Sequence, residues 1–293
     1  MSYRTILVHL NDSRRARKLL HHAAEIARAF EARLIGLHVS PTFHGRAVDP
    51  KYPHTPAIEG LQFSRDEEAD HLRSIFEELN TAERFGGEFR RFSGEFRRLA
   101  ADNCNPLDIV AARAHGADLV IASQTDRNWG LSSLLDFPEQ IAIMSGRPLL
   151  VIPNAFENPA VPKTAIIAWN QRREGTRAMY EALPLLKQAR AVELLIIDER
   201  NEHGALERQR DPHILPASAV VDALAAHGVK PSTVTMKSSG APIGCEISAR
   251  AEDQRADLLV MGAYGHSRLR ELVLGGATQH VLSHMTVPTF FSH

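Results

Sequence analysis

Hydrophobic residues in this chain fall into short, uninterrupted runs that alternate with longer stretches of helical periodicity. Leu119–Ala122 and Leu258–Met261 are such runs, and their length and composition are typical of buried strands. In the segment 16–27, by contrast, the apolar residues recur at the spacing of one helix face. Strands that are apolar throughout, alternating with amphipathic helices, predict an α/β fold whose parallel sheet carries helices on both faces.

The same pattern occurs twice along the chain. Segment 4–13 resembles segment 163–172, because each has a basic residue and a threonine, then an apolar run, then asparagine. Segment 116–122 likewise resembles 255–261, and each copy closes with a strand after a proline. The repeat predicts two tandem domains, each ordered β-α-β-α-β-α-β-α-β around a five-stranded parallel sheet.

A proline-rich connector lies between the two copies at 153–162. Prolines restrict the chain and remove backbone donors, so such a stretch is typical of a linker between domains. We therefore expect one domain over 1–153 and a second over 163–293.

The composition excludes several classes of protein. The 34 Lys and Arg residues balance 35 Asp and Glu residues, so the chain lacks the basic surface typical of general nucleic-acid binding. No apolar run approaches the ~18 residues of a membrane span, and no signal-peptide pattern precedes the strand at 6–10. The two cysteines, Cys104 and Cys245, cannot form a disulfide framework. We expect a cytoplasmic protein that engages neither nucleic acid nor membranes.

Glycines follow the apolar run 258–261 at a spacing that suits phosphate binding. Gly262 ends the run, Gly265 comes three residues later, and Gly275 and Gly276 precede a helical pattern. Glycines let backbone N–H groups approach an anion, and the next helix adds its positive N-terminal end. The alternative is a tight turn with close helix packing, which the same spacing also allows.

The first copy differs at the corresponding positions. It continues with Ser123–Gly130 where the second copy has its spaced glycines, and it has Leu135–Pro138 in place of the double glycine. A carboxylate at Asp126 or Asp136 would repel a phosphate. We interpret the first domain as structural or regulatory and the second as the ligand-binding domain.

With these residues in view, the chain resembles the universal stress protein family in its tandem, two-domain form. Nucleotide-binding members of that family carry Gly-x2-Gly-x9-Gly-Ser/Thr after the fourth strand, and Gly262, Gly265 and Gly275 match that spacing. The resemblance implies two Rossmann-like domains, similar to adenine nucleotide alpha hydrolases. It also implies an adenine nucleotide at the carboxyl ends of the strands, and domains related by a pseudo-twofold axis.

The resemblance also assigns candidate roles to individual residues. Backbone groups of the glycines would meet ribose and phosphates, Met261 would lie near the base or ribose, and Ile197 would face the adenine edge. His266 and Ser267 could reach the phosphates. The full set of candidate nucleotide-binding residues is Asn170, Ile197, Met261, Gly262, Gly265, His266, Ser267, Gly275, Gly276 and Ala277.

Two of these positions depart from the family pattern. Gly276 stands where the family has Ser or Thr, which removes one hydroxyl donor worth roughly 0.5–1.5 kcal/mol. Thr278 could replace that hydroxyl if the helix begins late. Asn170 stands where relatives usually have Asp, and beside it Trp169 would either close over an adenine or pack in the core.

Other chemistry-bearing residues have simpler interpretations. His280 and His284 lie one helical turn apart, but two ligands without a third more often form a solvated face, so we predict no metal site. Cys104 and Cys245 have no neighbouring base in sequence, and packing is their default role. Asp198 ends a strand and either holds a divalent ion or belongs to a solvated loop. No residue is predicted to be catalytic.

These observations predict a stress-response regulator that binds ATP, or AMP or ADP in its place, with Mg²⁺ as a companion ion. Its partners would be the adenine nucleotide and proteins of unknown identity, with a pseudo-dimer inside the chain or a homodimer of chains. Two alternatives stay open, an interaction scaffold that binds no nucleotide and a slow ATP hydrolase.

Overall fold

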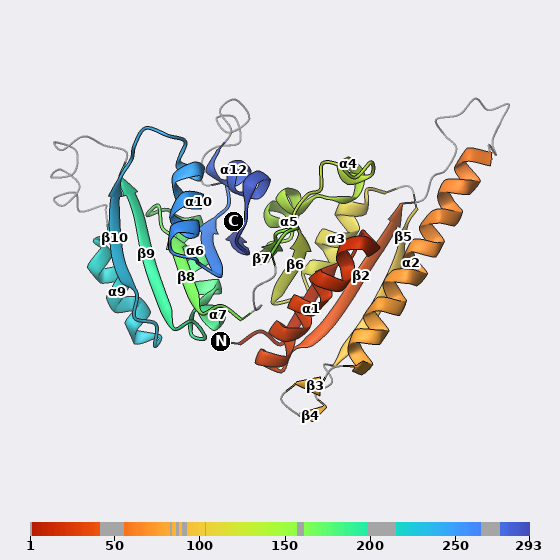
Figure 1. Cartoon of the computed structure of the whole chain (residues 1–293), viewed down its shortest axis with the longest axis horizontal. Coiled ribbons are helices and arrows are strands. Elements are labelled where there is room, and N and C mark those ends of the chain that lie inside the picture. The colour runs from red at the N-terminus through yellow and green to blue at the C-terminus, as the bar shows by residue number, and fades with distance from the viewer. Residues whose placement is uncertain are drawn as a thin grey trace. The chain divides into compact units, whose positions relative to one another are not determined.

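The computed structural model describes residues 2–41, 56–82, 84–85, 88–89, 93–102, 104–156, 161–198, 215–264 and 276–293. The chain forms two compact units (Figure 1). The N-terminal unit comprises 3–145, and the C-terminal unit comprises 146–293 together with 1–2.

The N-terminal unit contains a parallel sheet in the order β5-β2-β1-β6. Its elements are β1 (Thr5–His9), α1 (Ser13–Phe30), β2 (Arg33–Pro41), α2 (Pro56–Ala82), β3 (Arg84–Phe85), β4 (Glu88–Phe89), β5 (Gly94–Ala101), α3 (Pro106–Ala114), β6 (Leu119–Ser123), α4 (Ser132–Leu135) and α5 (Pro138–Met144). The short strands β3 and β4 form a separate antiparallel pair.

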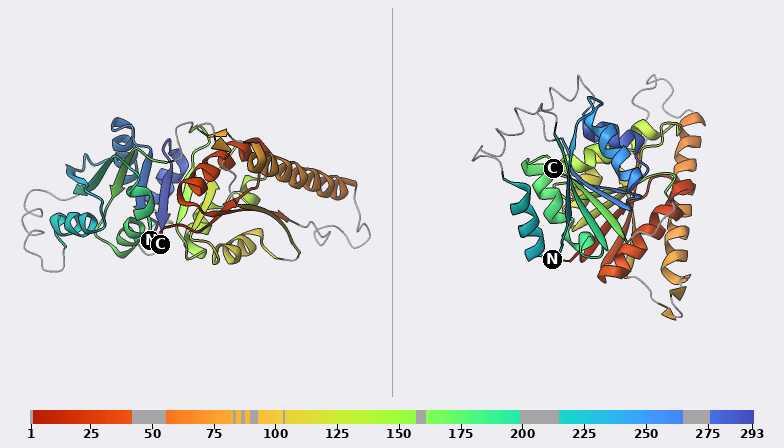
Figure 2. Two further views of the ribbon diagram at one scale, coloured as in Figure 1. Left: turned by 90° about the horizontal axis from the view of Figure 1, so that it is seen from below. Right: turned by 60° about the vertical axis from the view of Figure 1, so that its left-hand side comes forward.

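The C-terminal unit has five parallel strands in the order β10-β9-β8-β11-β12. Its elements are β7 (Leu149–Ile152), β8 (Thr164–Ala168), α6 (Arg173–Glu181), α7 (Leu183–Leu186), β9 (Ala191–Asp198), α9 (Ala217–Ala226), β10 (Ser232–Lys237), α10 (Ile243–Asp253), β11 (Leu258–Gly262), α12 (Ala277–His284) and β12 (Thr289–Ser292). Figure 2 shows α9 on the opposite side of this sheet from α10 and α12. The predicted α/β fold with a helix-covered parallel sheet is therefore confirmed.

One strand has a pairing that the sequence does not predict. The segment expected to close the N-terminal sheet forms β7, which groups with the C-terminal unit and pairs antiparallel with β12. Phe290 pairs with Leu150 and Phe291 with Leu149 in this register. Both phenylalanines are fully buried, and β7 covers a strand edge that would otherwise present unpaired backbone groups.

The two units share a pattern of hydrogen bonds that matches the repeat in the sequence. Asp118 Oδ2 accepts the backbone N–H groups of Arg4 at 2.8 Å and Thr5 at 3.0 Å. Asp257 Oδ2 accepts those of Lys163 at 3.0 Å and Thr164 at 3.1 Å. In each unit, an aspartate that precedes one strand, β6 or β11, therefore fixes the start of the neighbouring strand, β1 or β8.

Helix α10 packs against α12 at a position where only glycine fits. A Cβ at Gly244 would lie 2.7 Å from His280 Cβ and 3.0 Å from the carbonyl oxygen of Ala277. The two helices therefore approach backbone to backbone at their N-terminal turns, next to the end of β11.

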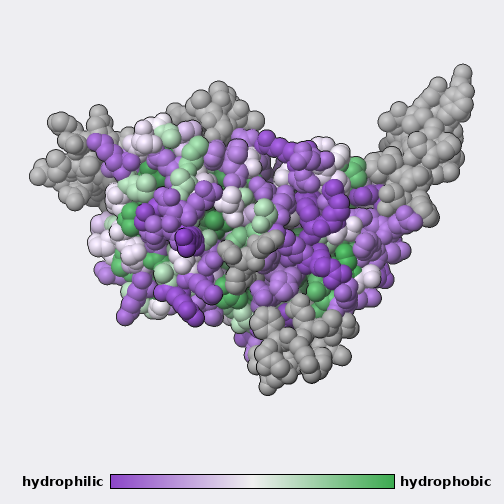
Figure 3. All heavy atoms as spheres, in the orientation of Figure 1, coloured by the Kyte–Doolittle hydropathy of each residue, from purple (hydrophilic) through white to green (hydrophobic). Residues whose placement is uncertain are grey.

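On the face drawn in Figure 3, the described residues are mainly hydrophilic, and hydrophobic residues form small separate patches among them. Leu134, Met144, Tyr180 and Leu215 are the large hydrophobic side chains exposed in the described ranges. In the same part of the chain, no helix is both long and apolar enough to cross a membrane.

Candidate functional site

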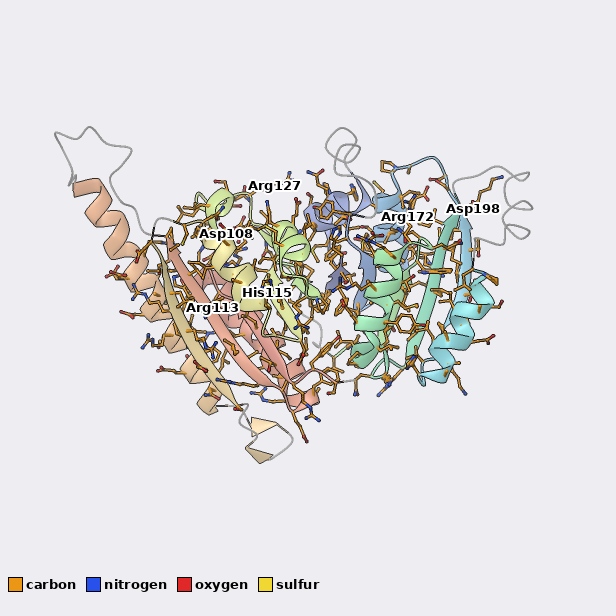
Figure 4. All side chains as sticks on the ribbon, turned by 180° about the vertical axis from the view of Figure 1, so that it is seen from behind. Asp108, Arg113, His115, Arg127, Arg172 and Asp198 are labelled. Atoms are coloured by element: carbon orange, nitrogen blue, oxygen red, sulfur yellow. The ribbon has the colours of Figure 1, made fainter. Side chains whose placement is uncertain are left out.

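The strand order of the C-terminal unit reverses between β8 and β11, and we call the region outside the carboxyl ends of these two strands the crevice. The chain leaves β8 toward β9 on one side and returns to β11 on the other, so the order reverses at this pair. Open α/β sheets bind ligands at such a reversal, outside the carboxyl ends of the strands. Figure 4 shows Arg172 and Asp198, which follow β8 and end β9, at this edge of the sheet.

Strand register brings three of the predicted residues to this edge. Ala168 lies opposite Met261 on β11 and opposite Leu195 on β9. Asn170 lies two residues beyond Ala168, and Ile197 two residues beyond Leu195, so both lie past the register that β8 and β9 share. Met261 is buried, whereas Ile197 is half-buried and Asn170 is exposed.

Asn170 is held by the turn that leads into α6. Its Oδ1 accepts the backbone N–H of Arg172 at 3.1 Å, and Gln171 adopts a positive φ of 62° between them. A Cβ at Gly175 would lie 2.7 Å from Asn170 Oδ1, so the glycine makes room for this side chain. The amide nitrogen of Asn170 has no hydrogen-bond partner within the described ranges, which leaves a donor available at the crevice.

Gly262 has a packing role in the structure. A Cβ at this position would lie 2.6 Å from the backbone nitrogen of Gly175 and 2.7 Å from the carbonyl carbon of Glu174. The end of β11 therefore abuts the first turn of α6, and any larger residue would separate them. This contact brings the backbone of Gly262 next to a helix N-terminus, where partial positive charge gathers.

Helix α12 begins at Ala277, with Gly276 as its N-cap and no side-chain capping bond. The expectation that Thr278 replaces the missing hydroxyl required a later start and is not met. Thr278 is buried, and its Oγ1 accepts the backbone N–H of Tyr264 at 3.2 Å. The threonine instead ties the end of β11 to α12.

Four predicted residues, Gly265, His266, Ser267 and Gly275, lie outside the described residues. Trp169 packs in the core with 4% of its surface exposed, so it does not close over the crevice. Its indole nitrogen is buried and has no hydrogen-bond partner among the residues that the structure describes.

Glu174 is a site residue that the sequence pattern did not single out. It lies in the first turn of α6 with only 7% of its surface exposed, and its Cβ would be 2.9 Å from a Cβ on Gly262. Arg173 Nε donates to Glu174 Oε1 at 2.8 Å. The only signal in sequence is an acidic residue near a helix start, which is common in any helix.

The N-terminal unit has the equivalent crevice, and its own chain fills it. Asn11 corresponds to Asn170 in the repeat, and its amide nitrogen donates to Asp136 Oδ1 at 2.5 Å and to the carbonyl of Leu135 at 2.7 Å. Arg15 Nη2 donates to both carboxylate oxygens of Asp136, at 2.9 and 3.1 Å. The backbone N–H of Asp126 donates to Asp136 Oδ2 at 2.9 Å.

Asp136 is thus an internal anion at the position where a ligand anion would bind. Its side chain is 1% exposed and that of Arg15 is 13% exposed. The sequence predicted that this carboxylate would repel phosphate; in the structure it also takes up the donors that a phosphate would need.

Two histidines of α12 lie one helical turn apart. His280 and His284 stack with ring centroids 4.5 Å apart, and His284 Nδ1 lies 3.0 Å from the carbonyl oxygen of His280. Within the described ranges, no group of three or more His, Cys, Asp or Glu side chains is placed to hold a metal ion.

Comparison with known families decides the identity of this fold. The model of the universal stress protein family matches residues 2–136 and again 171–292. The chain belongs to the universal stress protein family. Because one family model matches twice, this universal stress protein is of the tandem, two-domain type.

Solved structures show the same fold over the whole chain. A universal stress protein from Archaeoglobus fulgidus DSM 4304 is 13% identical, with a TM-score of 0.66, covering 98% of this chain and 95% of that one. One described as a putative universal stress protein, from Pseudomonas aeruginosa UCBPP-PA14, is 17% identical, with a TM-score of 0.61, covering 99% and 93%.

Sequence similarity to a curated relative is confined to a short segment. A universal stress protein of Synechocystis sp. is 54% identical over 37 residues. That stretch spans 13% of this chain and 13% of the relative. The similarity supports the family assignment. It is too short to indicate a function, which must be inferred from the residues of this chain.

Proposed function

We propose that this universal stress protein binds an adenine nucleotide at the crevice of its C-terminal unit and acts as a ligand-dependent regulator in the cytoplasm. The observation that carries the proposal is the contrast between Asn170 and Asn11. The Asn11 amide nitrogen is taken up by Asp136, whereas that of Asn170 has no partner within the described ranges. One crevice is therefore filled by the chain, and the other presents a donor to a ligand.

Glu174 supports an orientation for the nucleotide. It occupies the position that Arg15 holds in the first repeat, so the charge next to the crevice is reversed. A buried carboxylate disfavours a phosphate beside it and accepts hydrogen bonds from hydroxyl groups. We therefore orient the ribose toward α6 and Glu174, and the phosphates toward the N-terminus of α12.

The remaining contacts of the proposal come from the family pattern. Gly265, His266, Ser267 and Gly275 would surround the phosphates, with Gly276 and Ala277 at the helix start. Met261 and Ile197 would line the base. ATP, ADP and AMP share these contacts, and Mg²⁺ would enter with the nucleotide. Binding would shift the population of a state competent for protein partners.

Calorimetric titration of the purified full chain with ATP-Mg, ADP and AMP tests the proposal. We expect a dissociation constant on the order of micromolar for at least one nucleotide. Gly265→Asp, which places a carboxylate beside the phosphates, should abolish the signal. Gly130→Asp is the matched control, because that glycine belongs to the N-terminal unit and a Cβ added to it would meet nothing within 4 Å.

The titration also separates the two alternatives. No heat with any nucleotide, in protein shown by mass spectrometry to carry none already, would overturn the proposal in favour of an interaction scaffold. Release of phosphate from bound ATP, lost in Gly265→Asp and retained in Gly130→Asp, would extend the function to slow hydrolysis.

A further inference from the structure

A thiol and an imidazole meet where α10 packs on α12. Cys245 Sγ lies 3.7 Å from His280 Nδ1. Cys245 is in the first turn of α10, and His280 is in the first turns of α12. The close approach at Gly244 fixes the spacing of the two helices, so backbone packing holds the contact in place.

His280 is a neutral imidazole next to the thiol and can accept its proton, although its lowered pKa makes it a weaker base than a free imidazole. Burial, together with the neighbouring His284, lowers the pKa of His280, so its ring is neutral at neutral pH. The ring is also held in place by stacking on His284. The N-terminal turn of a helix stabilises a thiolate through its partial positive charge. The nucleophile, the proton acceptor and the stabilising dipole are therefore present together.

The chain offers an internal comparison in its other cysteine. Cys104 is exposed, whereas Cys245 is partly buried. Cys104 precedes the equivalent helix α3, but within the described ranges it makes no contact with an imidazole. If exposure decides the rate of thiol modification, Cys104 should react faster. If the contact with an imidazole decides it, Cys245 should react faster.

We propose that Cys245 is a modification site that reacts with low-molecular-weight disulfides, with His280 as the proton acceptor. The thiol proton passes to His280 Nδ1, and Cys245 Sγ attacks one sulfur of the disulfide R–S–S–R. A new S–S bond forms to Cys245 as the old one breaks, and the departing R–S⁻ takes the proton from His280 to leave as R–SH. The disulfide is the oxidant, so the exchange is balanced without a further reactant.

The adduct would have a structural consequence that does not depend on nucleotide binding. The R–S group would enter between α10 and α12, where Gly244 already leaves no room for a methyl group. We expect the first turn of α12 to move away from α10 in the modified protein.

The test uses glutathione disulfide on the full chain, with peptide mass spectrometry reporting each cysteine separately. We expect Cys245 to form the mixed disulfide ~10-fold faster than Cys104 at neutral pH, and His280→Gln to remove that advantage. His227→Gln, an exposed histidine of the same unit that pairs with Tyr180, is the control and should leave both rates unchanged.

A second measurement uses only the wild-type chain, so it does not depend on whether a variant folds. In concentrated urea the contact with His280 is lost, and the two cysteines should react at similar rates. If Cys104 reacts faster than Cys245 in the native protein, or if folded His280→Gln keeps the full rate at Cys245, the proposal is overturned.

Discussion

The amide nitrogen of Asn11 donates to Asp136 Oδ1 at 2.5 Å across 125 positions of sequence. This bond closes the crevice of the N-terminal unit with a carboxylate that belongs to the same chain. The first repeat therefore differs from the second both in lacking the spaced glycines and in having its crevice filled. The two crevices give different expectations for substitution.

Removing the internal anion should destabilise the N-terminal unit. In Asp136→Ala, Arg15 and Asn11 lose a buried partner, and breaking a buried pair typically costs ~3–5 kcal/mol. Urea unfolding measures the change. Asp108→Asn, at an exposed aspartate on α3 (Figure 4), should change the free energy of unfolding by less than ~0.5 kcal/mol. Equal, small effects from both variants would show that the Asp136 cluster contributes little.

Acid should weaken the N-terminal unit before its carboxylates titrate. Burial, followed by the charges of His38 and Arg15, lowers the pKa of His9 from 6.5 to about 3, and burial lowers that of His38 to about 4. Both rings are neutral in the folded state but protonated in the unfolded state below pH 6.5. Their stabilising effect is therefore complete above pH 6.5, and it is lost as pH falls toward about 4 for His38 and about 3 for His9.

The slope of this loss is measurable. Each histidine contributes up to ~1.4 kcal/mol per pH unit to the free energy of unfolding. Urea titrations at pH 7 and pH 5 should give a smaller difference for His9→Leu than for the wild type. His115→Gln, at an exposed histidine, should retain the wild-type difference. A pH-independent wild type would contradict the expectation.

The contact between α10 and α12 should tolerate no methyl group. Gly244→Ala places a Cβ 2.7 Å from His280 Cβ, and overpacking of this kind typically costs ~1–3 kcal/mol. Thermal unfolding should show the loss as a lower melting temperature. Gly116→Ala is the matched control, since its Cβ would meet only the carbonyl oxygen of Arg113, at 3.9 Å. A neutral Gly244→Ala would mean that the two helices can separate without cost.

The unpartnered amide of Asn170 should matter for ligand affinity more than for stability. Asn170→Ala removes the donor, and we expect the dissociation constant of the best-bound nucleotide to rise by up to ~10-fold. Because Asn170 is exposed, the melting temperature should change little. Calorimetry and thermal unfolding of the same sample separate the two effects. An unchanged affinity would place the nucleotide away from the end of β8.

The repeat and the α/β order could be read from sequence because they depend on local pattern. Continuous apolar runs specify strands with both faces buried, and the aspartates at 118 and 257 recur at the same place in each copy. The carboxyl-end location of Asn170 and Ile197 followed from the same pattern. These features need no knowledge of distant contacts.

Other features depend on partners that no local pattern specifies. The sequence predicts only that Asp136 repels a phosphate, because its donors Asn11 and Arg15 lie far away in sequence. The sequence gives no base for Cys245, because His280 is 35 positions away and on another helix. A short strand such as β7 encodes neither its neighbour nor its direction, so its antiparallel pairing could not be predicted.

That pairing determines where the chain can be cut. A fragment beginning at residue 163 would lack β7 and would expose the backbone edge of β12, with Phe290 and Phe291 behind it. Such an edge pairs readily with another copy of itself, so the fragment would be prone to self-association. A fragment beginning at residue 146 would keep the edge covered. A fragment of the second repeat should therefore begin before the proline-rich connector and include β7, the last strand of the preceding repeat.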